Sequence, residues 1–214
     1  NKGIPIRVKV YPDWPGKGFL CHEWQITCTD QFTDADYFVH IDSDCLFVEP
    51  VTPEDYFIDG KPVLMHGSYD WLEHDVQANL RMWQQTVVDA IGGDVPQETM
   101  RRHPAVHPRE TYVLTRECIA KHTGRDPAEY VKSCREEFAQ GYAEFNTLGA
   151  VAWRHLHDKY HWLDHEQLHK TQTPWPNNKL VQMWSHAPPT EPQEPVYKGR
   201  PFRCTPESLL ASIP

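Results

Sequence analysis

The chain has 214 residues, of which 39% are hydrophobic, and its formal net charge is −9 at pH 7. This length predicts one domain whose core is large enough to fold without disulfide bonds. The acidic balance argues against a general nucleic-acid-binding protein, because such proteins usually carry a basic surface patch. No transmembrane helix is expected, since no segment has about 18 consecutive apolar residues.

The six cysteines are spaced irregularly, and no pair has the C-x-x-C spacing of a structural zinc site. We interpret them as mostly buried thiols in a reducing compartment. Without a membrane segment, this predicts a cytoplasmic protein, with peripheral attachment to a membrane left open.

The first third of the chain alternates between predicted strands and helices. Residues 4–11 alternate apolar and polar side chains, which predicts a strand. Residues 19–32 place large side chains at four-residue steps, which predicts a helix. Residues 37–41 and 63–65 are short apolar runs typical of buried strands, and we expect the first to be parallel to its neighbours.

The rest of the chain has more helical signals. Residues 109–122 mix strand and helix signals, and the proline-flanked residues 104–108 predict a loop. Three further helices are expected, over residues 74–92, 127–138 and 145–160.

Strands alternating with helices predict an α/β fold with a mixed, mainly parallel sheet flanked by helices. We expect a single domain over residues 1–214, with a proline-rich tail from 174 to 214 wrapping over it. In such folds, ligands bind beyond the carboxyl ends of the strands. The triplet Asp42-Ser43-Asp44 follows the 37–41 strand directly and therefore occupies this position.

The two carboxylates of this triplet suit a hard divalent cation such as Mn²⁺ or Mg²⁺. A cation held there can neutralise the charge of a diphosphate. The alternative is a surface turn with Asx-type hydrogen bonds. The apolar residues on both sides of the triplet favour the cation site, because acids embedded among them need a partner.

The segment Ala35–Phe47 resembles the D-x-D segment of GT-A-fold, nucleotide-sugar glycosyltransferases of the bacterial and large-virus type. The segment Gly18–Gln25 is similar to a glycine-then-helix segment of that superfamily. The resemblance implies a GT-A-like (Rossmann-like) fold, with Mn²⁺ or Mg²⁺ and the donor bound at Asp42 and Asp44. It also implies a UDP- or GDP-linked sugar donor and a glycan or glycoconjugate acceptor. Residues 4–11 look like the second strand of such a fold, and its first strand and helix are not found.

The resemblance also suggests roles for two residues far along the chain. His186 is similar to a late histidine that completes the metal site, and an ordinary loop histidine is the alternative. Glu144 is similar to an acid that faces the acceptor, where it is a candidate for the base that deprotonates a hydroxyl. The alternative for Glu144 is a glutamate that the helix macrodipole favours. Further candidates for donor binding are Ser43, Lys17, Gln25, His66 and Gly67.

Several other acidic and histidine residues have two interpretations. Asp70, Glu73 and Asp75 are alternative candidates for the acceptor-side role suggested for Glu144. His103 and His107 lie beside an acceptor or, as we favour, in a rigid structural loop.

Two other functional classes remain open. A zinc hydrolase is suggested by His165, Glu166 and His169, which match H-E-x-x-H, and it requires a continuous helix over 163–171. In the same stretch, four-residue spacing would place His157, His161 and His165 on one face of a helix. A non-catalytic carbohydrate-binding domain is suggested by the eight tryptophans, whose rings suit sugar stacking.

Overall fold

The computed structural model describes eight stretches of the chain, and all structural statements below concern them: residues 18–42, 45–75, 80–101, 103–135, 141–173, 179–182, 196–197 and 200–201. Several predictions fall outside these stretches and are not addressed by the structure, namely those for residues 4–11, Lys17, Ser43, Asp44 and His186.

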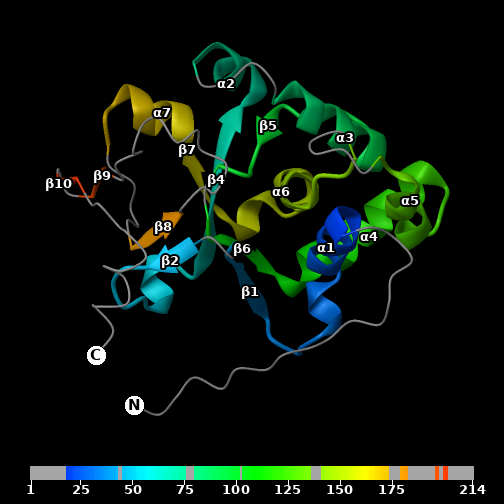
Figure 1. Cartoon of the computed structure of the whole chain (residues 1–214), viewed down its shortest axis with the longest axis horizontal. Coiled ribbons are helices and arrows are strands. Elements are labelled where there is room, and N and C mark those ends of the chain that lie inside the picture. Colours follow the sequence, from blue (N-terminus) through cyan, green and yellow to red (C-terminus); the bar gives the residue numbers. More distant parts are fainter. Residues whose placement is uncertain are drawn as a thin grey trace.

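The described strands are short, and β4 is the longest of them (Figure 1). They are β1 (Tyr37–His40), β2 (Cys45–Phe47), β3 (Phe57–Ile58), β4 (Lys61–Ser68), β5 (Gln97–Glu98), β6 (Ala105–Pro108), β7 (His161–Asp164), β8 (Leu180–Gln182), β9 (Val196–Tyr197) and β10 (Arg200–Pro201). Strand β4 is antiparallel to β3 and to β5, and it is parallel to β7. The remaining pairs, β1–β6, β2–β8 and β9–β10, are antiparallel.

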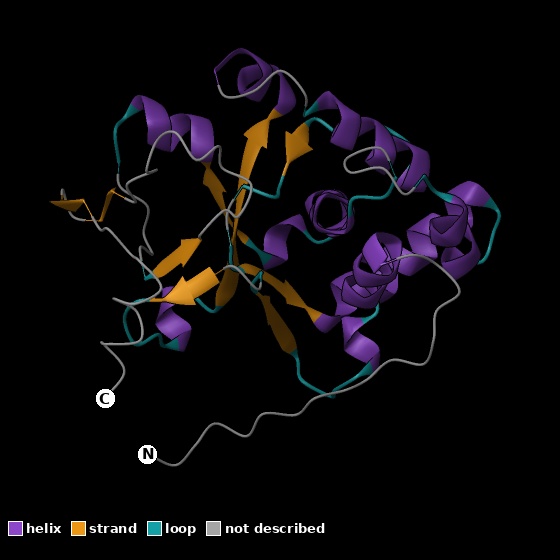
Figure 2. Cartoon of the chain, viewed as in Figure 1, coloured by secondary structure: helices purple, strands orange, loops and turns teal. Residues whose placement is uncertain are grey.

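The helices α1, α3, α4, α5 and α6 gather on one side of β1, β6 and β4 (Figure 2). The α-helices are α1 (Gly18–Thr27), α2 (Tyr69–Asp75), α3 (Arg81–Ile91), α4 (Arg109–Thr123), α5 (Pro127–Ser133), α6 (Glu144–His155) and α7 (His165–Lys170). Single 3₁₀ turns are η1 (Thr29–Gln31), η2 (Pro53–Asp55) and η3 (His157–Lys159).

Helix α6 is the centre of the helical layer. Its first nine residues are all buried, and it contacts α1, α3 and α4. Leu148 and Val151 are completely buried in the apolar core. Because α6 is covered by other elements along most of its length, its first residue, Glu144, is enclosed as well.

The chain is a mixed α/β protein, as the sequence predicts, but the expected mainly parallel pairing is wrong for the described strands, since only β4–β7 is parallel. Strand β1 is antiparallel to β6 and is not fully buried. Phe38 is buried, whereas Tyr37 and Val39 are 43% and 45% exposed. An apolar run identifies a strand, but the direction of its neighbour depends on how the chain returns.

The helix predictions are correct in kind and differ at their boundaries. The helix predicted over residues 74–92 overlaps the end of α2 and contains α3, which ends at Ile91 with Gly92 as its C-cap at a φ of 65°. The helices predicted over 127–138 and 145–160 end earlier, at Ser133 and His155. The loop predicted over 104–108 is wrong, because it contains β6; both prolines that suggested it flank or end a short paired strand.

Part of the predicted tail packs back onto the body of the chain, since β8 pairs with β2. The described cysteines are all free thiols; Cys28 is buried and the other four are half-buried. No helix in the described stretches combines the length and apolar character needed to cross a membrane.

Two histidines in the β1–β6 region predict that acid destabilises the fold. Burial lowers the pKa of His107 to about 3, and burial, helped by His103 and His22, lowers that of His40 to about 4. The unfolded chain, with histidine pKa values near 6.5, binds more protons below that pH than the folded protein does. Each histidine therefore costs up to about 1.4 kcal/mol of stability per pH unit below about 6.5.

Urea unfolding at pH 7 and pH 5 measures this effect. Burial raises the pKa of acids such as Glu98, and this makes the folded protein more stable as the pH falls. The effect of His107 is therefore measured by comparing the pH-dependent loss of stability of a His107 variant with that of the wild type. We expect the His107→Gln variant to lose less stability between the two pH values than the wild type. Equal losses in both proteins would contradict the assignment to His107.

Candidate functional site

The end of β1 lies beside the start of β6. In this antiparallel pair His40 lies opposite Ala105, so the next positions outward bring Asp42 opposite His103. The His103 Nε2 atom lies 2.8 Å from the Asp42 Oδ2 atom. The side chain of His103 is 9% exposed, and its ring packs edge-on against Phe145, with the ring centres 5.4 Å apart.

This pairing fixes Asp42 in its charged form. The hydrogen bond with His103 holds the pKa of Asp42 below its usual value, and electrostatic interactions with the nearby imidazoles act in the same direction. His40 is turned inward, where its Nε2 atom lies 2.6 Å from the hydroxyl of Tyr112. The strand therefore delivers an ionised carboxylate at its carboxyl end.

Helix α1 supplies a second carboxylate from its buried face. Leu20, Glu23 and Thr27 share this face at helical spacing, and all three are buried. The Thr27 hydroxyl lies 3.2 Å from that of Tyr142, which ties α1 to the start of α6. A carboxylate on such a face needs a polar partner.

Glu23 meets the N-terminus of α6. The backbone N–H of Glu144 donates to Glu23 Oε2 at 3.3 Å, and Ala143, the residue that precedes the helix, offers no side-chain cap. Glu23 thereby satisfies one of the amide groups that every helix leaves unpaired at its start. The imidazole of His22, one residue earlier, lies 3.9 Å from the other Glu23 oxygen.

Two groups of contacting side chains lie near enough for their charges to interact, and we call them together the Asp42 cluster: Asp42 with His103, and His22 with Glu23 and Glu144. One ligand atom from each of His22, Glu23 and Glu144 lies within 4.8 Å of the others. Burial raises the pKa of Glu23 despite the opposing hydrogen bond and charge of His22, and the charge of Asp42 adds a smaller increase. The nearby Glu23 carboxylate, with a smaller contribution from Asp42, raises the pKa of His22. Asp42 and Glu144, the two described residues with predicted central roles, are therefore linked through Glu23, which feels the charge of Asp42 and accepts the Glu144 N–H.

The other described candidates are not brought into this cluster by any contact. Gln25 donates to Cys21 within α1. His66 Nδ1 lies 3.0 Å from Gln97 Oε1, and its ring packs against Trp153. A side chain at Gly67 would come within 3.2 Å of Leu72, so the close approach that this glycine permits is to α2. Their roles in donor binding stay predictions.

The alternative acids near β4 have a different environment. Asp70 and Glu73 both pair with Arg81 on the surface, and the Glu73 contact measures 3.0 Å. The side chain of Asp75 lies outside the described residues.

The continuous helix required by the zinc-hydrolase alternative is not present, and that expectation is wrong. Residues 161–164 form β7, and α7 starts only at His165. Glu166 pairs with Lys170 at 2.5 Å, while the rings of His165 and His169 both pack against Trp71. The expected helical face of His157, His161 and His165 is also wrong, because these residues fall in η3, β7 and α7.

Sequence reasoning missed Glu23 and His22 and favoured a structural role for His103. The signal for Glu23 was a charged side chain at the third position after Leu20 and the fourth before Thr27, within an otherwise inward face. For His103 no local signal was available, since its position follows from the β1–β6 register. His107 lies in strand β6 and not in the loop expected for it, and its Nδ1 atom lies 2.9 Å from the hydroxyl of Tyr160.

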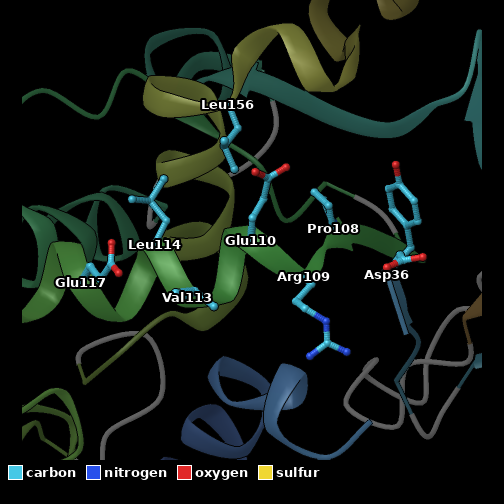
Figure 3. Close-up of a pocket in the computed structure, with 9 residues that line it drawn as sticks. Asp36, Pro108, Arg109, Glu110, Val113, Leu114, Glu117 and Leu156 are labelled. Atoms are coloured by element: carbon cyan, nitrogen blue, oxygen red, sulfur yellow. The ribbon is translucent and has the colours of Figure 1, made fainter. Parts of the chain in front are cut away.

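A groove along α4 is lined by residues that do not belong to the Asp42 cluster (Figure 3). Arg109 points away from Glu110 there and donates to backbone carbonyls, including that of Asp30 at 2.6 Å. The groove therefore offers acids and apolar side chains, with its one arginine already engaged in holding the preceding loop.

The Asp42 cluster has the chemistry of a site that binds cations and moves protons. It combines an ionised strand-end carboxylate, two enclosed glutamates and two imidazoles.

Comparison of the sequence with protein-family models and with curated proteins found no match to either.

Proposed function

We propose that the protein is a metal-dependent glycosyltransferase that moves a sugar from a UDP- or GDP-linked donor to a hydroxyl of a carbohydrate acceptor. The observation that carries this proposal is that the charge of Asp42 acts on Glu23, whose carboxylate accepts the backbone N–H of Glu144, although the three residues come from separate parts of the chain. A D-x-D carboxylate for the donor and a separate carboxylate for the acceptor are what such a reaction requires.

The carboxylate of Asp42 fits a hard divalent cation. It is ionised, because His103 holds its pKa low, and it stands at the carboxyl end of a strand. Asp42, with Ser43 and Asp44, would hold Mn²⁺ or Mg²⁺, which would neutralise charge on the donor diphosphate. His103 is a positioning residue in this proposal, since it orients the Asp42 carboxylate.

Glu144 is the proposed base on the acceptor side. Its enclosed position excludes most water, and a carboxylate near a sugar hydroxyl takes the proton as the new glycosidic bond forms. The sugar leaves the nucleoside diphosphate for the acceptor oxygen, and the diphosphate departs with its charge partly neutralised.

Calorimetric titration with UDP, GDP and their sugars, in Mn²⁺ and then in chelator, tests the donor half of this proposal. We expect one nucleotide class to bind in Mn²⁺ and to lose affinity in chelator. Asp42→Asn should weaken that binding by at least about 10- to 100-fold, because the loss of an outer-shell partner of a metal ligand already costs this much. Asp34→Asn, on the exposed loop before β1, is the matched control and should change it little.

Absence of nucleotide binding by the wild type under all conditions would refute the donor assignment. Binding of free glycans without nucleotide or metal would instead support the carbohydrate-binding alternative. Nucleotide binding that is unchanged by Asp42→Asn would place the donor elsewhere.

A further inference from the structure

His22, Glu23 and Glu144 come from two elements that are distant in sequence and adjacent in space. The His22 imidazole and the two carboxylates each offer one ligand atom, and these atoms lie within 4.8 Å of one another. Ligands about 2.1 Å from a zinc ion lie roughly 3 to 4 Å apart. Small side-chain rotations would therefore bring all three onto one ion.

The two carboxylates are enclosed, which makes their proximity costly without a positive partner. Glu23 and Glu144 are 4% and 5% exposed. Among the described charged side chains, those that act on Glu23 are His22 and a further acid, Asp42. Neighbouring enclosed carboxylates require a shared proton or a cation, and the His22 imidazole beside Glu23 and Glu144 adds a third metal ligand, which favours a cation.

We propose that His22, Glu23 and Glu144 bind a divalent transition-metal ion, Zn²⁺ in the first instance, at a site distinct from the D-x-D triplet. One imidazole and two carboxylates suit Zn²⁺ better than Mg²⁺ or Ca²⁺, which prefer oxygen ligands alone. The side chain of His22 is 60% exposed, so the ion has a path from solvent. The second Glu23 oxygen already accepts the Glu144 N–H, which holds this ligand in place.

The binding does not rest on the proposed transferase reaction, but it has a consequence for it. Glu144 cannot take a proton from an acceptor while it holds an ion. Zn²⁺ at this site should therefore inhibit sugar transfer, whereas Mn²⁺ at the triplet supports it.

Titration calorimetry with ZnCl₂, without nucleotide, tests the site directly. We expect one Zn²⁺ per chain with the wild type and at least a tenfold weaker Kd with His22→Ala and with Glu23→Gln. His22 is exposed, so its removal should leave the fold intact, and glutamine at position 23 can still accept the Glu144 N–H. His155→Ala removes an exposed histidine from α6 and should leave the Kd unchanged.

Thermal unfolding gives a second, independent readout. An ion that joins α1 to α6 stabilises the folded state, and a hundredfold excess of Zn²⁺ over Kd should raise the Tm of the wild type by about 5 to 10 °C. The His22→Ala variant should show less than half of that shift.

Three results would overturn the proposal: no Zn²⁺ binding by the wild type, equal binding by wild type and His22→Ala, or binding lost in Asp42→Asn and retained in Glu23→Gln. The last would place the ion at the triplet. Because no nucleotide is present, failure of the transferase proposal leaves these results interpretable.

Discussion

The Glu144→Gln variant should bind the donor normally and transfer sugar about 10² to 10⁴ times more slowly than the wild type. Glutamine keeps the size of the side chain but cannot accept a proton, and loss of a general base costs roughly this factor in kcat. Donor binding should change less than threefold, because the proposal places the nucleotide at Asp42. The measurement is kcat for transfer, with the Kd for the nucleotide determined in parallel.

Glu110→Gln is the matched control for this experiment. Glu110 also stands in the first turn of a helix, α4, but it is exposed and pairs with Lys159 at 2.5 Å. Both substitutions should cost a similar, small amount of stability, about 0.3 to 1 kcal/mol, through the helix macrodipole. If both variants keep full kcat, Glu144 is a helix-start glutamate and not the base.

Much of the helical layer can be predicted from the sequence, because its determinants are local. Gly92 and Gly124 end α3 and α4 with positive φ angles of 65° and 66°. Asp126 caps α5 through hydrogen bonds to two backbone amides. Such signals act within a few residues, so they can be recognised in the sequence without knowledge of the tertiary structure.

The arrangement of the strands is harder to predict, because pairing joins residues that are far apart. The apolar run at 37–41 correctly indicates a strand, and its burial was overestimated because one of its faces is exposed. Nothing local specifies that it pairs with residues 105–108, which themselves look like a proline-bounded loop. The same limitation explains why His103 was judged structural.

The candidate site shows the same division between local and long-range information. Asp42 stands out because an apolar strand ends on it, and Glu144 was suggested by family resemblance. Glu23 and His22 become part of the site only when α1 packs against the start of α6. The sequence thus indicates which residues have suitable chemistry. It indicates less readily which of these residues lie together in the folded protein.

The Asp30→Ala variant should be less stable than the wild type by about 3 to 5 kcal/mol. Arg116 on α4 donates to both carboxylate oxygens of Asp30, at 2.6 and 2.7 Å, and also to the carbonyl of Thr27. The Asp30 and Arg116 side chains are 7% and 16% exposed. Removing one partner leaves an enclosed charge without compensation, which is the costly way to break such a pair. Urea unfolding measures the loss.

A double variant separates the cost of the stranded charge from the net value of the ion pair. Replacing both residues by apolar ones, as Asp30→Leu with Arg116→Met, should recover most of the stability, because no charge is then left enclosed. Glu110→Ala, which breaks an exposed pair on the same helix, should cost about 1 kcal/mol or less. A similarly small loss for Asp30→Ala would mean that water reaches Arg116. A large loss restored in the double variant would show that the cost comes from the stranded Arg116 charge, and that apolar side chains hold α4 against the segment leading into β1 as well as the ion pair does.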